Sequence, residues 1–124
     1  MKIENLEEFL NEISREKLLS EEEERVLIKA VQEKGLDHGE EAEQLVKSNL
    51  RMVVSLVRQY QNRGLSVEEL ISIGAEELRK SILSYDLGGD TKFTRHFVAL
   101  LRVRFSGEIT NYGKEYDYKN REAH

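Results

Sequence analysis

The chain contains no cysteine, no proline and no tryptophan among its 124 residues. Without cysteine there is neither a disulfide framework nor a thiolate metal site, which is compatible with a reducing compartment. No apolar run reaches the roughly 18–20 residues that a membrane-spanning helix requires. The first residues after Met1 are acidic and form no apolar signal core. These absences predict a cytoplasmic protein that has no membrane partner.

Motifs of the common enzyme classes are also missing. The chain has no glycine-rich phosphate loop, no G-x-S-x-G and no H-E-x-x-H segment. His38 and Glu41 have the i, i+3 spacing of two metal ligands, but two ligands without a third do not make a site. The sequence therefore predicts a protein that is not an enzyme and binds no metal, cofactor or small-molecule substrate.

The charge of the chain is unevenly distributed. A net charge of −5 argues against a general coating protein for nucleic acid, because phosphate contact favours Lys and Arg. Residues 91–107 nevertheless contain no acidic side chain and include Lys92, Arg95, His96, Arg102 and Arg104. This stretch is compatible with a local DNA-facing surface, and equally with the solvated side of an amphipathic helix.

Apolar residues recur at helical spacing along the whole chain, and no stretch alternates with the period of a strand. The pattern predicts an all-α fold, a compact bundle of about five helices joined by short connections. The expected helices cover about residues 3–13, 20–35, 40–62, 66–85 and a last one that begins near Thr91 or Thr94. Phe97 falls on the apolar stripe of the last helix and is expected in the core.

Local signals mark several helix ends. Ser20 with Glu23, and Ser66 with Glu69, have the spacing of capping boxes. Gly35 is expected to end the second helix.

After Ile109 the chain is polar and rich in tyrosine. This tail either extends the last helix or frays, and Asn111 with Gly113 favours a break. We therefore divide the chain into a helical domain over residues 1–109 and a polar tail over 110–124. The start at Met1 favours a complete short protein.

Three ordered segments carry a specific resemblance. They read NLRMVVS at 49–55, NRGLS at 62–66 and ELI at 69–71. Together they resemble domain 2 of the bacterial sigma-70 family of RNA polymerase specificity subunits. FLNEI at 9–13 with LLSEEE at 18–23 is similar to region 1.2 of that family, and KFT at 92–94 to the start of region 2.3. The resemblance covers about residues 6–109 and includes nothing of regions 3 and 4.

The resemblance implies that the fourth helix binds the clamp helices of the largest subunit of core RNA polymerase. Glu69 keeps the acid of the family, whereas Ser72, Ile73 and Ala75 replace the usual Gln, Glu and Asn. Ile73 is interpreted as an apolar residue on an exposed side, where it would suit a different partner. The candidate polymerase-binding residues are Glu69, Ser72, Ile73, Glu76 and Arg79.

In region 2.3 of the family, aromatic side chains stack on bases that leave the duplex when a promoter opens. Here His96 stands in place of a Tyr, Ala99 and Leu100 in place of a Trp pair, and Val103 in place of a Gln. The resemblance therefore implies that promoter melting is largely lost. What DNA contact remains is expected to be weak and driven by phosphate, through Lys92, Arg95, His96, Arg102 and Arg104.

Two functions of different classes follow. The chain is either a sigma-type initiation factor that binds polymerase and promoter DNA, or a protein–protein module that keeps the fold and competes for or modifies the polymerase without reading DNA. A helical scaffold unrelated to transcription is a third interpretation.

Overall fold

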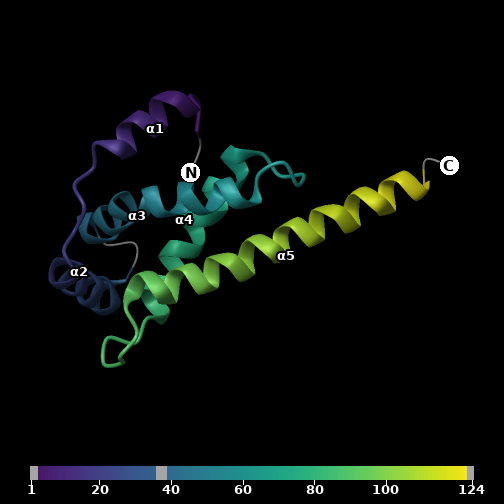
Figure 1. Ribbon diagram of the computed structural model, residues 1–124. Helices are drawn as coiled ribbons and strands as arrows, with labels where there is room; N and C mark the ends of the chain where they lie inside the picture. Colours follow the sequence, from purple (N-terminus) through teal and green to yellow (C-terminus); the bar gives the residue numbers. More distant parts are fainter. Residues whose placement is uncertain (1–2, 36–38, 123–124) are drawn as a thin grey trace.

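Five α-helices make up the computed structural model, which describes residues 3–35 and 39–122 and has no strand among them (Figure 1). The all-α prediction is confirmed. The helices are α1 (Leu6–Ser14), α2 (Glu21–Lys34), α3 (Glu40–Tyr60), α4 (Val67–Ser84) and α5 (Phe93–Glu122). None of the helices described is long and apolar enough to cross a membrane.

Helix α4 lies at the centre of the bundle and packs against α2, α3 and α5. Helix α1 packs on α3 at the outside. Helix α5 crosses the bundle and then projects well beyond the other helices, so the described C-terminal end lies far from the core (Figure 1). This arrangement places one side of α4 and the outer side of α5 on the surface.

The predicted ends of α2 are confirmed. Ser20 is its N-cap: the backbone N–H of Glu23 donates to Ser20 Oγ at 3.1 Å, and the backbone N–H of Ser20 donates to Glu23 Oε1 at 3.2 Å. Such reciprocal bonds satisfy two amides that a helix start leaves unpaired. The helix ends at Gly35, whose φ of 90° lies in the region that glycine tolerates best.

Long-range side-chain bonds to backbone carbonyls hold the ends of two helices. Gln32 of α2 donates to the carbonyls of Ile82 and Tyr85 at 2.9 and 2.8 Å, at the C-terminal end of α4. Arg51 of α3 donates to the carbonyls of Ile13 and Glu16 at 3.1 and 3.2 Å and also to that of Ser14. Carbonyls at a helix end have no partner within the helix, so these bonds attach α1 and α4 to their neighbours.

The core is closely packed where α3, α4 and α5 meet. Phe97 and Phe105 of α5 are fully buried, which confirms the core position predicted for Phe97. Gly74 of α4 lies directly against Val53 of α3, and a Cβ at position 74 would overlap Val53 Cγ1. The absence of a side chain at Gly74 therefore allows α3 and α4 to approach each other.

The predicted break in the last helix is wrong. Helix α5 continues through Asn111 and Gly113 to Glu122, so the proposed domain boundary after Ile109 falls inside a helix. A glycine within a helix costs only about 1 kcal/mol relative to alanine, and no proline interrupts the segment. The Tyr112 side chain packs against Gly64 of the α3–α4 connection and supports the helix at this point.

Candidate functional site

The exposed side of α4 begins at its first turn. Ser66 is the N-cap and accepts a bond from the backbone N–H of Glu69 at 3.0 Å, one of the two bonds of the predicted capping box. The Glu69 side chain is exposed. Ser72 is half-buried. Ile73 is half-buried and packs against the core, so the expectation of an apolar residue on an exposed side is only partly met.

Arg79 is occupied by a neighbouring helix. Its Nη2 atom lies 2.9 Å from Glu43 Oε1 of α3, and its side chain is half-buried. The candidate binding residue Arg79 is therefore only partly accessible to a partner. Any partner that used the guanidinium of Arg79 would have to compete with Glu43.

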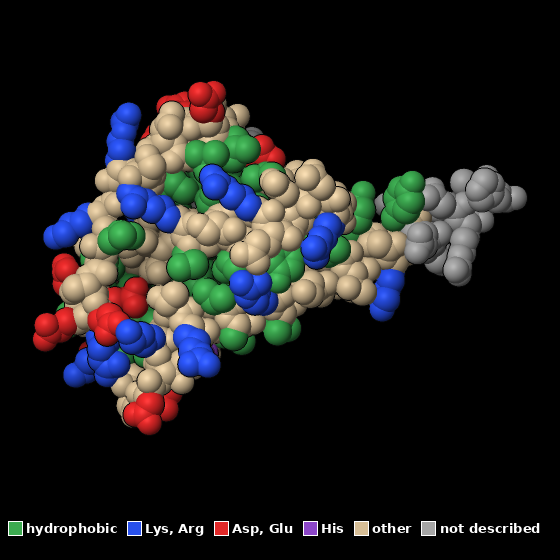
Figure 2. Space-filling view, in the orientation of Figure 1, with side chains coloured by type: hydrophobic (Ala, Val, Ile, Leu, Met, Phe, Trp, Pro, Cys, Tyr) green, Lys and Arg blue, Asp and Glu red, His purple; other side chains and the backbone are tan. Residues whose placement is uncertain are grey.

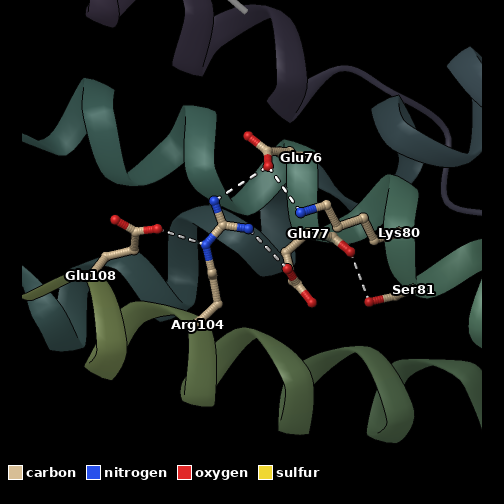
Figure 3. Close-up of polar contacts among 6 residues, drawn as sticks. All are labelled: Glu76, Glu77, Lys80, Ser81, Arg104 and Glu108. Carbon is tan, nitrogen blue, oxygen red and sulfur yellow. Dashed lines mark hydrogen bonds and ion pairs between the residues drawn. The ribbon is translucent and has the colours of Figure 1, made fainter. Parts of the chain in front are cut away.

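Arg104 of α5 is the centre of a cluster of acidic side chains (Figure 3). Its Nε atom lies 2.9 Å from Glu108 Oε1, its Nη1 atom 3.1 Å from Glu77 Oε2 and its Nη2 atom 3.3 Å from Glu76 Oε1. Glu76 also bridges to Lys80 at 3.1 Å. The cluster joins the exposed side of α4 to α5.

The electrostatics of the cluster follow from these contacts. Burial disfavours the charge of Arg104, but hydrogen bonds to Glu108, Glu76 and Glu77 outweigh it and raise the pKa of the guanidinium. Hydrogen bonds from Lys80 and Arg104 lower the pKa of Glu76. Both shifts favour the charged forms of Arg104 and Glu76, and the carboxylates around Arg104 largely neutralise its charge.

The remaining candidates for DNA contact point in different directions. Lys92 pairs with Glu21 of α2 at 2.9 Å, and His96 Nε2 lies 3.0 Å from Ser84 Oγ. Arg102 donates to Gln59 Oε1 of α3 at 3.0 Å, whereas Arg95 is exposed.

Residues 91–107 contain no acidic side chain. In the folded structure, however, carboxylates of α2 and α4 lie next to Lys92 and Arg104. The contact of all these residues with DNA stays a prediction.

The outer side of α5 has little to stack on a base between residues 94 and 107. Ala99 is exposed and Leu100 half-buried, and these are the positions of the Trp pair in the resemblance. Val103 is 73% exposed. Both phenylalanines of this stretch, Phe97 and Phe105, are fully buried. Among the α5 side chains that the structure describes, Tyr112 and Tyr116 are exposed aromatic residues, further along the helix.

No group of three or more potential metal ligands occurs among the described side chains of residues 3–35 and 39–116. His38, the partner considered for Glu41, lies outside the described residues. Glu41 itself pairs with Lys34 at 3.1 Å.

The chain is similar to several RNA polymerase sigma factors. It is 37% identical to sigma-G of Bacillus subtilis over 95 residues, which are 77% of this chain and 34% of that protein. It is 36% identical to sigma-G of Clostridium acetobutylicum over 70 residues, 56% of this chain and 26% of that protein. It is 29% identical to sigma factor SigA4 of Synechococcus elongatus over 86% of this chain and 40% of that protein. No protein-family model matches the chain.

The all-α fold and these similarities define a relative of RNA polymerase sigma factors. The chain is a homologue of the sigma-70 family, and the resemblance seen in the sequence is confirmed. It spans about half or less of the length of the curated relatives that it matches.

Sequence reasoning missed the charged cluster around Arg104. The i, i+4 spacing of Arg104 and Glu108 was a visible signal for one of its ion pairs. The contacts to Glu76 and Glu77 depend on how α4 and α5 align, which periodicity does not give.

Proposed function

We propose that this chain acts as a sigma-like factor in transcription initiation and binds core RNA polymerase through the exposed side of α4. The observation that carries the proposal is the similarity to sigma factors over three quarters of the chain. It is supported by the position of Glu69, an exposed acid on the first turn of α4, where the resemblance implies contact with the clamp helices.

The ion pairs of α4 determine which of its charged residues a partner can contact directly. Glu69 is exposed, and Glu76 is exposed but shared between Lys80 and Arg104. Arg79 is held by Glu43. Among the described side chains Glu69 forms no ion pair, so it can contact a partner directly. Glu76 and Arg79 would each have to break an existing ion pair to do so. Ser72 and Ile73, both half-buried, would border the contact.

Reversal of charge at Glu69 tests the proposal. We expect Glu69→Lys to weaken capture of the chain by immobilised core RNA polymerase about fivefold or more, the usual effect of removing a well-placed interface contact. Glu33→Lys is the matched control, because Glu33 is exposed on α2 and its reversal changes the net charge equally. Equal capture of both variants and the wild type would refute the role of α4.

Arg79 requires its own control, because its replacement also removes the ion pair with Glu43. If Arg79 contacts the polymerase, Arg79→Glu weakens capture more than Glu43→Gln, which removes the same ion pair but keeps the arginine. If the two variants lose capture equally, Arg79 acts only on the packing of α3 and α4.

We further propose that the chain does not open promoters by itself. The basis is the surface of α5, where Ala99 and Leu100 replace the aromatic pair and Arg104 is surrounded by carboxylates.

The same features favour the second candidate function. In that case the chain competes with another sigma factor for the polymerase, or modifies it, without reading DNA. The discriminating measurement is transcription by a sigma-saturated polymerase with added chain. A competitor lowers the amount of transcript, and an initiation factor creates transcripts from promoters of its own.

A further inference from the structure

A hollow between α1 and α3 has an apolar lining. Its volume is about 160 Å³, which is comparable with that of cavities that hold a benzene-sized molecule. Phe9 and Ile13 line it from α1, and Val46 and Leu50 line it from α3. Phe9 is half-buried, whereas the other three are buried. The hollow is therefore suited to one apolar side chain of a partner.

Acidic side chains border this hollow. Glu12 and Glu16 line it together with the apolar residues. A second hollow along α1 shares Phe9 and Glu12 with the first, and it is also lined by Glu4 and Glu8. The two hollows therefore adjoin and form one surface, which we call the α1 groove.

The α1 groove carries a net negative charge. The four carboxylates just named take part in no ion pair among the described side chains. Glu43 also lines the first hollow, but it is held by Arg79 at 2.9 Å. Lys47 is the cation among the residues that line either hollow. The groove is therefore a surface for a cationic partner that also offers an apolar side chain.

The first half of α5 presents a surface of this kind. Arg95, Ala99 and Arg102 are exposed and follow one another at spacings of four and three residues, so they share one side of the helix. Val103 borders this side and is 73% exposed, more than any other large apolar side chain that the structure describes. Arg102 bonds to the neutral Gln59, so it keeps its charge. We call the surface made by Arg95, Ala99, Arg102 and Val103 the α5 basic face.

The two surfaces match in length and lie apart on one molecule. Helix α1 has nine residues and the α5 basic face spans residues 95–103, so each is about 13 Å long. Figure 2 shows acidic side chains gathered at the upper edge of the molecule, where Figure 1 places α1, and Lys and Arg side chains along α5 and over the middle of the face. Helix α1 packs on α3, whereas α5 packs on α4. A single folded chain thus does not bring the two surfaces together, whereas a second copy can.

We propose that the α5 basic face of one copy of the chain docks in the α1 groove of a second copy. Val103 occupies the hollow between α1 and α3, and the neighbouring Arg102 meets the carboxylate of Glu12. Arg95, two helical turns away, meets the acids further along the groove. The chain is thus its own partner, because it supplies the cationic helix that its acidic groove requires.

Local charge determines how strongly the copies associate. The net charge of −5 makes whole copies repel each other, so association depends on the groove and the basic face and weakens as salt screens their charges. Arg95 and Arg102 are also the cations of this stretch that no described acid pairs with, so a docked copy cannot use them for DNA phosphates. The contact does not use the exposed side of α4, so it can be absent while the proposed polymerase binding stands.

Sedimentation velocity of the full chain measures this association. At low salt we expect the average mass to rise with protein concentration, from the micromolar range to about 1 mM. In about 1 M salt, where the screening length is ~3 Å, the chain should associate less. A wild type that stays monomeric at low salt and about 1 mM would overturn the proposal.

Two charge reversals test the pair of surfaces. Glu12→Lys in the groove and Arg102→Glu on the basic face should each weaken self-association about fivefold or more, the usual effect of removing a well-placed interface contact. An equal mixture of the two variants should regain association of wild-type strength, because each variant keeps the surface that the other lacks. A variant that had merely unfolded could not be rescued in this way. A mixture that stays monomeric would show that the two surfaces do not meet.

Matched controls separate this contact from general effects of charge and hydrophobicity. Glu33→Lys on α2 changes the net charge as much as Glu12→Lys does and should not weaken association. Val103→Ser should weaken association, whereas Val26→Ser, at a 66% exposed position of α2, should not. The proposal would be overturned if either α2 variant lost as much association as its counterpart. It would also be overturned if Tyr116→Leu abolished association, because the projecting end of α5 would then be the interface.

Discussion

Replacing Gly74 by alanine should destabilise the protein, although glycine to alanine inside a helix normally has the opposite effect. Gly74 lies in α4 at its contact with α3. An added Cβ would come closer to Val53 Cγ1 than the 3.0 Å below which such atoms essentially never approach, and would lie 3.6 Å from Phe105 Cζ. Val53 is fully buried, and a β-branched side chain cannot easily turn away.

Two opposing effects set the magnitude. The propensity of alanine for helices stabilises the variant by about 1 kcal/mol. Forcing an extra methyl group into a packed core costs about 1–3 kcal/mol. The net change is a loss of ~0–2 kcal/mol. Gly107→Ala in α5 is the matched control, because nothing lies within 4 Å of a Cβ there and only the gain of about 1 kcal/mol remains. The two variants should therefore differ by about 1–3 kcal/mol.

Urea unfolding followed by circular dichroism measures this difference. The reasoning also predicts that Val53→Ala is less harmful when Gly74→Ala is present than when it is absent, because the smaller side chain makes room for the new methyl group. If Gly74→Ala stabilised the protein as much as Gly107→Ala, the close approach of α3 and α4 would be wrong.

Three further predictions concern pH, salt and promoter opening. Burial raises the pKa of Glu24 above its ordinary 4.5, against a hydrogen bond from Asn49. The contribution of Glu24 to stability is thus fully present below pH 4.5 and is lost as the pH rises through its raised pKa in the folded protein. Glu24→Gln should therefore raise the urea midpoint of unfolding at pH 7 but not at pH 4. An equal gain at both pH values would contradict this. Because Lys92 and Arg104 are paired with acids, DNA contact in the first half of α5 should rest on Arg95 and Arg102. The log of the affinity for duplex DNA should then fall with the log of the salt concentration with a slope of about −2, and a salt-insensitive, sequence-selective complex would refute the phosphate-driven contact. Core polymerase with the chain should give no melting signal on a promoter that carries a fluorescent base in its −10 element, and robust opening would show that other residues replace the missing aromatic pair.

Features that depend on neighbouring residues in the sequence could be predicted. The capping box of Ser20, the end of α2 at Gly35 and the burial of Phe97 all follow from short spacings, and each is confirmed. The resemblance to the sigma-70 family also rests on ordered local segments and is confirmed by the similar proteins.

Features that depend on contacts between helices could not be predicted. Asn111 and Gly113 suggested a break, but tertiary contact of Tyr112 with Gly64 and the length of α5 outweigh a weak propensity. Ile73 is half-buried because α4 has neighbours on several sides. The carboxylates around Arg104 come largely from another helix.

Titration of the fluorescently labelled chain with core RNA polymerase tests the central claim most directly. The account predicts saturable binding, and displacement of the chain by an intact sigma-70 factor, because both would use the same site on the polymerase. The measurement needs no promoter. If the chain showed no binding with core polymerase at tens of micromolar, or if it bound without being displaced, the proposal of a sigma-like polymerase contact through α4 would be contradicted.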